Sequence, residues 1–447
     1  MNVQNEMEMK AFLDDFAKKS YTEIFNIRSR LEQSEWERKA LTNLRETIFQ
    51  NKNKYPNTKN VLYIHIPFCV TRCDYCPYYT HPYNPMLVSE YLNALEKEIL
   101  SIKDTPFIKS TVFSSLYFGG GTPSLLSVDH IKRLSEVIFN NFSFDIGAEL
   151  SFESNPSTLT EEKIKTLRNC GFNRVSLGIQ TFNDQLLKEM SCAHTSEKAR
   201  SVINLLFEYG FIVNTDMIYG LIGQTENDLE RDLHELCQCK APHQVTLFPL
   251  RIAEHTPLGE ELQKKEGITI QSHFNRLLEY DSLAEKILLA NQFSREESPV
   301  FYYKEGSIPH KYSSTETRIV GLGAGAGTLL DEGEGCNYYD VREYISAVNE
   351  NRSPALSGIR LTQQQAYERF VLYRILYMNR SSSDFRENLE KGFYEYYNTS
   401  LSNKIHLKVL SDMERMKFIK TTNEEIIFTD RLWRVLNKVK IGMPSII

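Results

Sequence analysis

The alternation of short β-rich runs with longer amphipathic runs constrains the fold of this chain more than any other feature. Six strand candidates follow one another along the sequence, at residues 61–66, 114–118, 149–154, 174–179, 213–221 and 243–250. The runs between them, such as 86–103 and 184–209, carry apolar residues at helical spacing. Repeated βα units form a parallel sheet, and right-handed crossovers wind such a sheet into a barrel or partial barrel. We therefore predict an α/β fold with functional residues at the C-terminal ends of the strands.

The regions on either side of this alternation differ from it in pattern. Residues 1–60 predict an N-terminal helical extension, with helix near 6–48, followed by a polar linker. The barrel core is expected over 61–260, and an accessory segment with a Gly-rich loop is expected over 261–360. In 361–447, helices followed by short strands predict a small helical or winged-helix-like domain.

Composition narrows the classes of function. The formal net charge of −6 over 447 residues argues against a dedicated nucleic-acid-binding protein, which normally presents a basic face. No apolar run approaches the roughly 20 residues that a membrane span needs. The acidic N-terminus lacks the basic and apolar regions of a signal peptide. We therefore expect a cytoplasmic protein that acts on a small-molecule substrate and binds neither nucleic acid nor membrane.

Three of the eight cysteines crowd into one short segment, Cys69-x3-Cys73-x2-Cys76. Clustered cysteines in a long intracellular chain favour metal binding, although a disulfide within the segment stays an alternative. Thiolates are the soft ligands of iron–sulfur clusters, and three of them hold three irons of a cubane and leave the fourth open. A zinc site completed by His65 or His81 is the other alternative, because zinc usually takes four ligands. The scattered cysteines that we expect to be structural thiols on helices are Cys170, Cys237 and Cys239.

A CxxxCxxC motif after a strand, within a βα barrel, resembles the radical S-adenosylmethionine (radical SAM) superfamily. An ordered set of further motifs resembles the subgroup of oxygen-independent coproporphyrinogen III oxidases and HemW-type haem chaperones. The shared segments are YIHIPFC (63–69), YFGGGTPSLL (117–126), Glu153-x-Asn155-Pro156, RVSLGIQTF (174–182), DMIYGLIGQT (216–225) and GLGAGAG (321–327). The resemblance implies a partial (β/α)6-type radical SAM barrel that binds a [4Fe–4S] cluster and S-adenosylmethionine. It also implies a 5′-deoxyadenosyl radical as the reactive species and a flavodoxin or ferredoxin as electron donor.

The resemblance further implies roles for individual residues at positions that match the family's motifs. Glu153 would hold the cationic sulfonium and ammonium groups, Gln180 the carboxylate or ribose, and Asp216 the ribose hydroxyls. The other residues implied to contact the cofactor are Tyr63, Tyr75, Gly119, Gly120, Gly121, Thr122, Gly323 and Gly325. The first glycine run would contact the methionine amino group, and the second would lie near a second S-adenosylmethionine or the substrate. From the residues alone, two other interpretations stay open. Tyr75 could be a loop aromatic that packs on the core, and the second glycine run could be a turn that allows tight backbone packing.

Three positions depart from the family's pattern. Tyr78 stands where the coproporphyrinogen oxidases carry a further cysteine. His310 lacks the partners that complete an H-N-x-x-Y-W element in the haem chaperones. Cys192 stands where the family usually has an Arg that grips the methionine carboxylate. Either Arg174 or another base compensates for that Arg, or the cofactor sits differently.

These departures favour the divergent tailoring enzymes of the subgroup. We therefore predict a radical SAM enzyme that uses two molecules of S-adenosylmethionine to transfer a methyl or methylene group to an unsaturated carbon, as radical methyltransferases and cyclopropanases do. One alternative is oxidative decarboxylation of the kind catalysed by coproporphyrinogen III oxidase. The other is a non-catalytic haem chaperone.

Overall fold

The computed structural model describes residues 44–55, 58–78, 80–250, 252, 256–264, 270–295, 301–305 and 317–361, with short runs between 363 and 428. In the predicted N-terminal extension it describes α5, which spans Leu44–Phe49. Beyond residue 361 the described strands are β15 (Ile419–Thr421) and β16 (Ile426–Phe428), which pair antiparallel. The rest of the predicted N-terminal helix, His310 and most of the predicted C-terminal domain lie outside the described residues.

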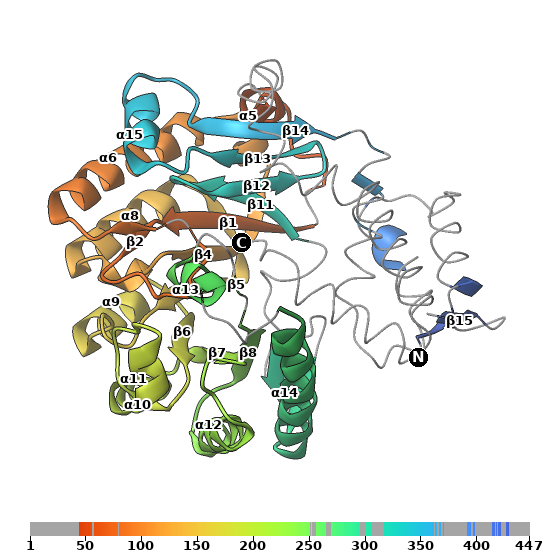
Figure 1. Cartoon of the computed structure of the whole chain (residues 1–447). Coiled ribbons are helices and arrows are strands. Elements are labelled where there is room, and N and C mark those ends of the chain that lie inside the picture. Colours follow the sequence, from red (N-terminus) through yellow and green to blue (C-terminus); the bar gives the residue numbers. More distant parts are fainter. Residues whose placement is uncertain are drawn as a thin grey trace.

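Six parallel strands form the centre of a 12-stranded sheet and confirm the predicted α/β architecture (Figure 1). They are β1 (Lys59–Ile66), β4 (Val112–Gly120), β5 (Ser143–Ser154), β6 (Arg174–Gln180), β7 (Ile212–Tyr219) and β8 (Gln244–Pro249). Their order in the sheet follows their order in the chain, so their C-terminal ends lie along one edge. This is the arrangement of a partial (β/α)6 barrel.

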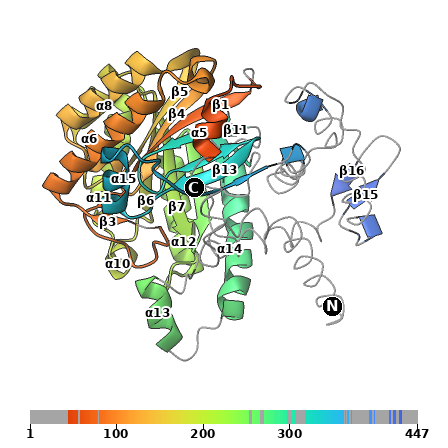
Figure 2. The same ribbon diagram turned by 90° about the horizontal axis from the view of Figure 1, so that it is seen from above.

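Helices that follow these strands cover the outer face of the sheet (Figure 2). They are α6 (Pro85–Ile102), α8 (Val128–Asn141), α9 (Glu161–Asn169), α11 (Ser196–Glu208) and α12 (Glu226–Gln238). Each begins at a side chain that accepts a hydrogen bond from a backbone N–H of the first turn, which typically stabilises a helix by about 1 kcal/mol. The capping residues are Asn84, Ser127, Thr160, Thr195 and Thr225. None of the described helices has the length and apolar character that crossing a membrane requires.

The single helix predicted over 184–209 is wrong, because two helices occupy this region. The first is α10 (Asp184–Glu189), and α11 begins only at Ser196. Between them Ser191 has a left-handed backbone with a φ of 55°, which ends a right-handed helix. Thr195 then caps α11 by accepting a hydrogen bond from the N–H of Lys198. Apolar periodicity continues through the break, and therefore the pattern did not reveal it.

The segment predicted to be accessory adds strands to both edges of the same sheet. On one side β11 (Thr317–Leu322) pairs parallel with β1, and three antiparallel strands follow it. These are β12 (Gly327–Leu330), β13 (Gly333–Asn337) and β14 (Ala355–Arg360), with α15 (Val341–Asn349) before β14. On the other side β10 (Phe301–Lys304) and β9 (Phe293–Arg295) continue antiparallel from β8. The helices α13 (Pro257–Lys264) and α14 (Ile270–Ala290) lie in the chain between β8 and β9.

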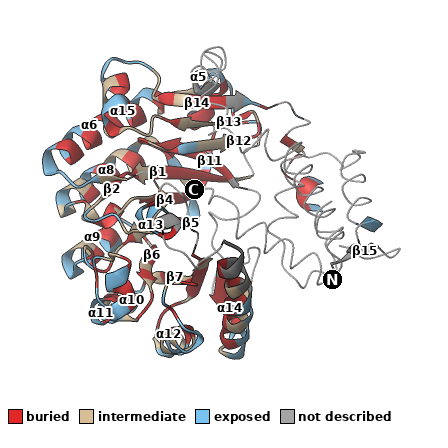
Figure 3. Cartoon of the chain, in the orientation of Figure 1, coloured by how far each residue is buried: buried red, intermediate tan, exposed pale blue. Residues whose placement is uncertain are grey.

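The two faces of the barrel strands differ in chemistry, because successive side chains of a strand point to opposite sides. Side chains that face the helices are apolar and form one large buried core, in which Leu62, Phe118, Phe152 and Leu177 take part. Figure 3 shows this buried layer along the strands and on the inner sides of the helices, whose outer sides are exposed. The alternate side chains face into the barrel and are mostly polar.

Candidate functional site

The three clustered cysteines lie on the loop that follows β1, at the C-terminal edge of the barrel. Cys69 belongs to the short strand β2 (Phe68–Cys69), which pairs with β3 (His81–Pro82). The glycine loop at the end of β4 holds this segment with two backbone hydrogen bonds of 2.8 Å, from Gly121 to Ile66 and from Thr122 to Phe68. The Thr122 hydroxyl also lies 3.5 Å from the Cys69 sulfur. The structure therefore brings the cysteine motif and the first glycine motif together.

At two positions of this loop the neighbouring atoms lie so close that a residue with a Cβ atom would not fit. A Cβ atom on Gly121 would lie 2.6 Å from the Phe68 carbonyl oxygen, and one on Gly120 would lie 2.7 Å from His65 Nε2. Gly120 also has a φ of 111°, which residues with a Cβ rarely adopt. A Cβ on Gly119 would lie about 3 Å from the side chains of Tyr117, Tyr63 and Glu153. The glycine loop thus packs tightly between the cysteine loop and the barrel interior.

The environments of the three cluster thiols differ. Burial raises the pKa of Cys69, and it raises the pKa of Cys76 to about 11. The pKa of Cys73 shifts in the opposite direction. A hydrogen bond with the Cys192 side chain lowers it to about 7. The N–H of Cys76 donates to the Cys73 carbonyl oxygen at 3.0 Å, so these two cysteines lie in one tight turn. Iron binds thiolates, so formation of a cluster here would release protons.

The zinc and disulfide alternatives can be compared with the contacts of the residues involved. Among the described residues, no three His, Cys, Asp or Glu side chains converge closely enough to hold one metal ion. His65 Nδ1 lies 3.0 Å from the Tyr63 hydroxyl, and burial lowers the pKa of His65 to about 4. His81 Nδ1 lies 2.9 Å from the Pro82 carbonyl oxygen. All eight cysteines lie in the described part of the chain, and no disulfide joins any of them. The three cysteines of one loop match the ligand number of a cubane with one open iron.

Glu153 lies beside the glycine loop, at the end of β5. Its carboxylate accepts hydrogen bonds from the Tyr117 hydroxyl at 2.7 Å and from the N–H of Gly120 at 3.1 Å. Burial raises its pKa to about 7, and the nearby charge of Asp216 acts in the same direction. A cation close to such a carboxyl group lowers its pKa and favours its ionised form. The ionised carboxylate then attracts the cation. Its position therefore suits the sulfonium and ammonium groups that the sequence assigned to it.

A chain of polar contacts continues from there into the barrel. Asp216 accepts hydrogen bonds from the Ser176 hydroxyl at 2.9 Å and from Asn214 Nδ2 at 2.7 Å. Thr246 extends the chain by donating to Asn214 Oδ1 at 3.0 Å. Burial raises the pKa of Asp216, whereas these hydrogen bonds and the charge of Arg174 lower it. Asp216 therefore lies deeper than the strand end and inside the barrel.

Arg174 does not replace the family's Arg. It is the first residue of β6, and its buried guanidinium donates to Gln244 Oε1 at 2.9 Å and to the Ser151 hydroxyl at 3.4 Å. Gln180 ends the same strand at the cofactor edge, about 20 Å away at the rise of a β-strand. Arg174 thus lies below the strand end, inside the barrel, where its charge lowers the pKa of Glu153 and of Asp216.

Gln180 has a left-handed backbone with a φ of 62°, which is uncommon for a residue with a side chain. The following turn is held by Asp232 of α12, which accepts hydrogen bonds from the Thr181 hydroxyl at 2.5 Å and from the N–H of Phe182 at 2.9 Å. Strained backbone of this kind persists only where its surroundings enforce it, and it is frequent at ligand sites. The backbone of Gln180 is consistent with a ligand contact, and its contact with the cofactor stays a prediction.

The second glycine run follows β11, the parallel neighbour of β1, and so lies at the same edge of the sheet as the cysteine loop. The N–H of Gly323 donates to Glu98 Oε2 at 2.8 Å, and a Cβ on Gly323 would lie 2.3 Å from the Tyr91 hydroxyl. The N–H of Gly325 donates to the Tyr338 carbonyl at 2.8 Å, and its Cα faces the His65 ring. Close packing thus accounts for Gly323, and contact of either glycine with a second cofactor or the substrate stays a prediction.

Two further residues line this region that the sequence motifs did not indicate. Tyr117 holds Glu153, and His65 lies against Gly120 and the Tyr63 hydroxyl. The signal was available in the strand alternation, because Tyr63 and His65 share one face of β1 and Tyr117 shares a face with Gly119. The sequence analysis considered His65 only as a zinc ligand.

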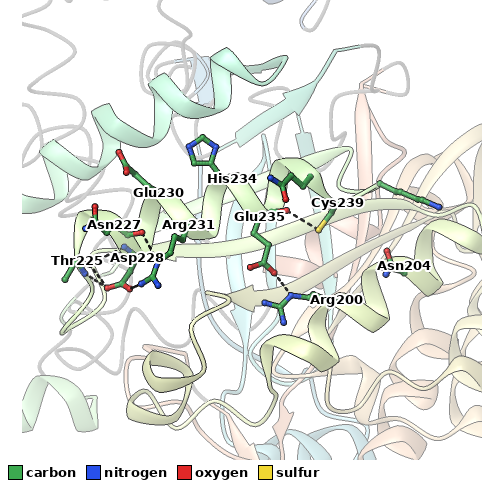
Figure 4. A pocket seen from close by; sticks show the side chains of 12 residues that line it. Arg200, Asn204, Thr225, Asn227, Asp228, Glu230, Arg231, His234, Glu235 and Cys239 are labelled. Atoms are coloured by element: carbon green, nitrogen blue, oxygen red, sulfur yellow. Dashed lines mark hydrogen bonds and ion pairs between the residues drawn. The ribbon is translucent and has the colours of Figure 1, made fainter.

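An open pocket, here called the outer hollow, lies on the outer surface between α11 and α12 (Figure 4). It has a volume of about 1330 Å³ and contains the ion pairs Arg200–Glu235 and Arg231–Asp228. Its lining includes Cys239 but none of the residues predicted to bind the cluster or the cofactor. Cys170, Cys237 and Cys239 pack against the core. These features identify the outer hollow as a charged surface region separate from the barrel mouth.

Comparisons with known proteins agree with the motifs. Residues 63–236 match the model of the radical SAM superfamily. Heme chaperone HemW from Lactococcus lactis subsp. lactis (strain IL1403) is 27% identical over 382 residues, which cover 85% of this chain and 96% of that protein. Oxygen-independent coproporphyrinogen III oxidase from Escherichia coli (strain K12) is 27% identical over 351 residues, which cover 74% of each.

A solved structure supports the fold independently. Coproporphyrinogen III oxidase (HemN) from Escherichia coli aligns with a TM-score of 0.71 at 23% sequence identity. The alignment covers 89% of this chain and 93% of that one, so the similarity extends well beyond the six central strands. Together with the superfamily match, it confirms the resemblance that the ordered motifs predicted.

Proposed function

Because this chain is a radical SAM protein of the HemN- and HemW-like kind, we propose that it is an enzyme that reductively cleaves S-adenosylmethionine at a [4Fe–4S] cluster. One observation carries the proposal. The loop of Cys69, Cys73 and Cys76 lies at the C-terminal edge of the barrel, where hydrogen bonds hold it against Thr122 and the glycine loop. When bound, the cluster and the cofactor supply one-electron cleavage of the sulfonium and abstraction of a hydrogen atom from the substrate.

The protein's own residues position the cofactor and shield it from water. Glu153 provides a carboxylate for the cationic end of the cofactor. Hydrogen bonds from the Tyr117 hydroxyl and the N–H of Gly120 hold this carboxylate in place. Asp216 offers acceptors to the ribose hydroxyls from within the barrel. Tyr75 packs with Cys192 against an apolar cluster that includes Leu186 and Leu250, and so covers one side of the cysteine loop. These residues would hold the cofactor at the C-terminal edge of the barrel, beside the cysteine loop.

We propose a tetrapyrrole as the substrate class and oxidation as the reaction. The two relatives are named for heme and for coproporphyrinogen III, which are both tetrapyrroles. Oxidation is favoured over transport because the sequence lacks the partners of His310 that complete the haem chaperone element. A flavodoxin or ferredoxin is the proposed electron donor.

Methyl or methylene transfer with two molecules of S-adenosylmethionine is the second candidate. The observation that favours it is Tyr78, which occupies the position of a further cysteine in the oxidases. The names of the relatives fit oxidation and haem transfer better than methyl transfer. We therefore rank this reaction below oxidation.

The proposal is tested with anaerobically reconstituted protein. Iron and sulfide are measured first, and the protein is then incubated with a reductant, methyl-labelled S-adenosylmethionine and coproporphyrinogen III, followed by mass spectrometry. We expect about four irons per chain, in line with a cubane, and release of 5′-deoxyadenosine with an unlabelled oxidised product. Label in the product would establish transfer instead, and haem binding without 5′-deoxyadenosine would establish a chaperone. A Cys170→Ala variant is the matched control, because Cys170 packs against the core at the end of α9.

A further inference from the structure

Two basic side chains of α14 bind the backbone at the C-terminal ends of β7 and β8. His273 Nε2 donates to the carbonyl oxygen of Leu250 at 2.9 Å, and Arg276 Nη2 donates to that of Gly220 at 3.0 Å. Gly220 and Leu250 directly follow β7 and β8 in the chain. The C-terminal ends of these strands lie along the same edge of the sheet as the cysteine loop. Arg276 therefore lies at the rim of the barrel mouth.

Packing connects this part of the rim to the cysteine loop. Leu221 and Leu250 belong to a buried apolar cluster against which Tyr75 packs, and Tyr75 lies between the second and third cysteines. The N–H of Leu258 in α13 also donates to the Asp74 carbonyl oxygen at 3.0 Å. This part of the rim is therefore next to the place proposed for the cofactor.

Within the described part of the chain, no acidic side chain forms an ion pair with Arg276. Its Nη2 lies 3.2 Å from His273 Nδ1, which is an acceptor because His273 Nε2 is already a donor, and its Cζ lies 5.9 Å from the centre of the Tyr280 ring. Burial lowers the pKa of His273, so this neighbour stays neutral. Arg295 and Arg318 differ, because each pairs with two carboxylates. The half-buried charge of Arg276 is thus available to an anion that enters the barrel mouth.

A second side chain at this turn also has a donor without a partner. Gln224 is only 3% exposed, and its Oε1 accepts hydrogen bonds from the N–H groups of Gly220 at 2.7 Å and Leu221 at 3.3 Å. These bonds fix which end of the amide is the oxygen. The nitrogen, Gln224 Nε2, is buried and has no hydrogen-bond partner, and the same holds for Arg276 Nε. Buried donors without partners are uncommon and cost free energy, so an acceptor bound here would stabilise both.

We propose that Arg276, together with Gln224, binds a carboxylate group of a small molecule in the barrel mouth. An ionised carboxylate offers only acceptors, which matches a guanidinium and an amide N–H that lack partners. The inference rests on the proposed function, which names the two molecules that bring a carboxylate to this edge. S-adenosylmethionine carries one on its methionine part, and coproporphyrinogen III carries them on its propionate side chains. The chemistry is the same for both, so the experiment has to distinguish the source.

The test combines variants of the protein with variants of the ligand. Arg276→Met removes the charge at similar length, and Arg276→Lys retains it. Gln224→Glu keeps the acceptor for the two N–H groups but replaces the donor. Each protein is reconstituted anaerobically, its iron and sulfide are measured, and its ligand affinities are determined by isothermal titration calorimetry without reductant. S-adenosylmethionine and coproporphyrinogen III are each compared with the analogue in which every carboxylate is a neutral carboxamide. Arg133→Met, on the exposed side of α8, is the control arginine.

We expect Arg276→Met to weaken binding of one acid by about 10- to 100-fold, the usual effect of losing a hydrogen bond between charged groups, and to leave binding of its carboxamide nearly unchanged. Arg276→Lys should lose less, and Gln224→Glu should weaken binding of the same acid. A loss confined to coproporphyrinogen III identifies a substrate carboxylate, and a loss confined to S-adenosylmethionine identifies that of the cofactor.

The proposal is overturned if Arg276→Met changes the affinity of acid and carboxamide equally in both pairs, or changes neither, because Arg276 would then only pack the rim. Wild-type protein that does not bind coproporphyrinogen III would refute the proposed substrate class, and the cofactor pair alone would then decide. Wild-type protein without iron and sulfide would refute the proposed function itself, so the failures are distinguishable.

Discussion

Neighbouring residues of one barrel strand serve different purposes. In β5, Phe152 points to the helices and packs at centroid distances of 5.3 Å against both Phe118 and Phe172. The next residue, Glu153, points into the barrel and binds Tyr117 and Gly120 through its two oxygens. The outer face buries apolar area and has no chemical group to offer a ligand. The inner face holds ionisable groups in hydrogen-bonded positions, which costs stability unless every group finds a partner.

The difference teaches that the fold and the activity are carried by alternate residues of the same strands. Substitutions on the outer face should lower stability, whereas substitutions on the inner face should change cofactor binding. The following predictions test this separation, beginning with the largest effect.

Replacing any cluster cysteine should abolish activity while the protein stays folded. In Cys73→Ala the cluster loses one of its three thiolate ligands, and ligand loss of this kind removes the open-iron site on which cofactor cleavage depends. We expect loss of the cluster's absorbance and no detectable 5′-deoxyadenosine. Cys170→Ala should retain both, and an active Cys73→Ala variant would refute the proposed site.

Phe152→Ala should lower the free energy of unfolding by about 3–5 kcal/mol, because it opens a cavity among fully buried aromatic rings. Urea unfolding of the variant and the wild type measures this effect. Cofactor affinity, measured on the fraction that remains folded, should be nearly unchanged. A large loss of affinity without loss of stability would contradict the separation of the two faces.

Gly120→Ala should affect both properties, because Gly120 lies where the two regions meet. A methyl group there meets the His65 ring at 2.7–2.8 Å, and the backbone φ of 111° disfavours alanine. We expect a loss of about 1–3 kcal/mol in stability, the usual range for a strained backbone position, and weaker cofactor binding. Gly147→Ala is the matched control, since Gly147 also has a positive φ but open space around its Cα.

The affinity for S-adenosylmethionine should rise with pH through neutrality. The pKa of Glu153 is about 7, so the carboxyl group is mostly neutral at pH 6 and mostly ionised at pH 8. Binding of a cation should therefore strengthen about tenfold over this interval. Glu153→Gln should bind more weakly and lose the dependence on pH, as isothermal titration calorimetry would show.

The same raised pKa has the opposite effect on the unliganded protein. The folded protein holds this proton more tightly than the unfolded chain, whose glutamates have a pKa near 4.5. The contribution to stability is full below that value and is lost as the pH rises through about 7. Unfolding of the Glu153→Gln variant should not show this change.

The smallest effect is expected at the outer hollow. Arg200 and Glu235 form an ion pair there, with 43% and 33% of their side chains exposed. Exposed pairs of this kind contribute about 0–1 kcal/mol. Glu235→Gln should therefore change neither stability nor cofactor cleavage by a measurable amount. A marked loss of activity would show that this surface is coupled to the barrel mouth.

The sequence predicted the local parts of this architecture well. The six central strands and most of the crossover helices follow from periodicity within short windows, and the cysteine motif lies within one loop. The close fit of Gly121 against Phe68 could not be predicted, because it depends on how two strand ends meet. The same is true of Arg174, whose buried side chain binds Gln244 and Ser151 inside the barrel. Contacts between distant segments, such as Cys192 with Cys73, leave no periodic signal in a single sequence.

The pairing of β11 with β1 has a consequence for the order in which the protein matures. The strand that leads into the cysteine loop lacks its outer neighbour until the chain has been made as far as residue 322. The carboxylate of Glu98 likewise accepts hydrogen bonds from Gly323, Asn337 and Tyr344, which all lie beyond this point in the chain. Contacts so distant in sequence form slowly because a long loop must close first. A ribosome-bound chain that ends before this point would therefore expose one edge of β1, and insertion of iron and sulfide should await synthesis of the last third of the protein.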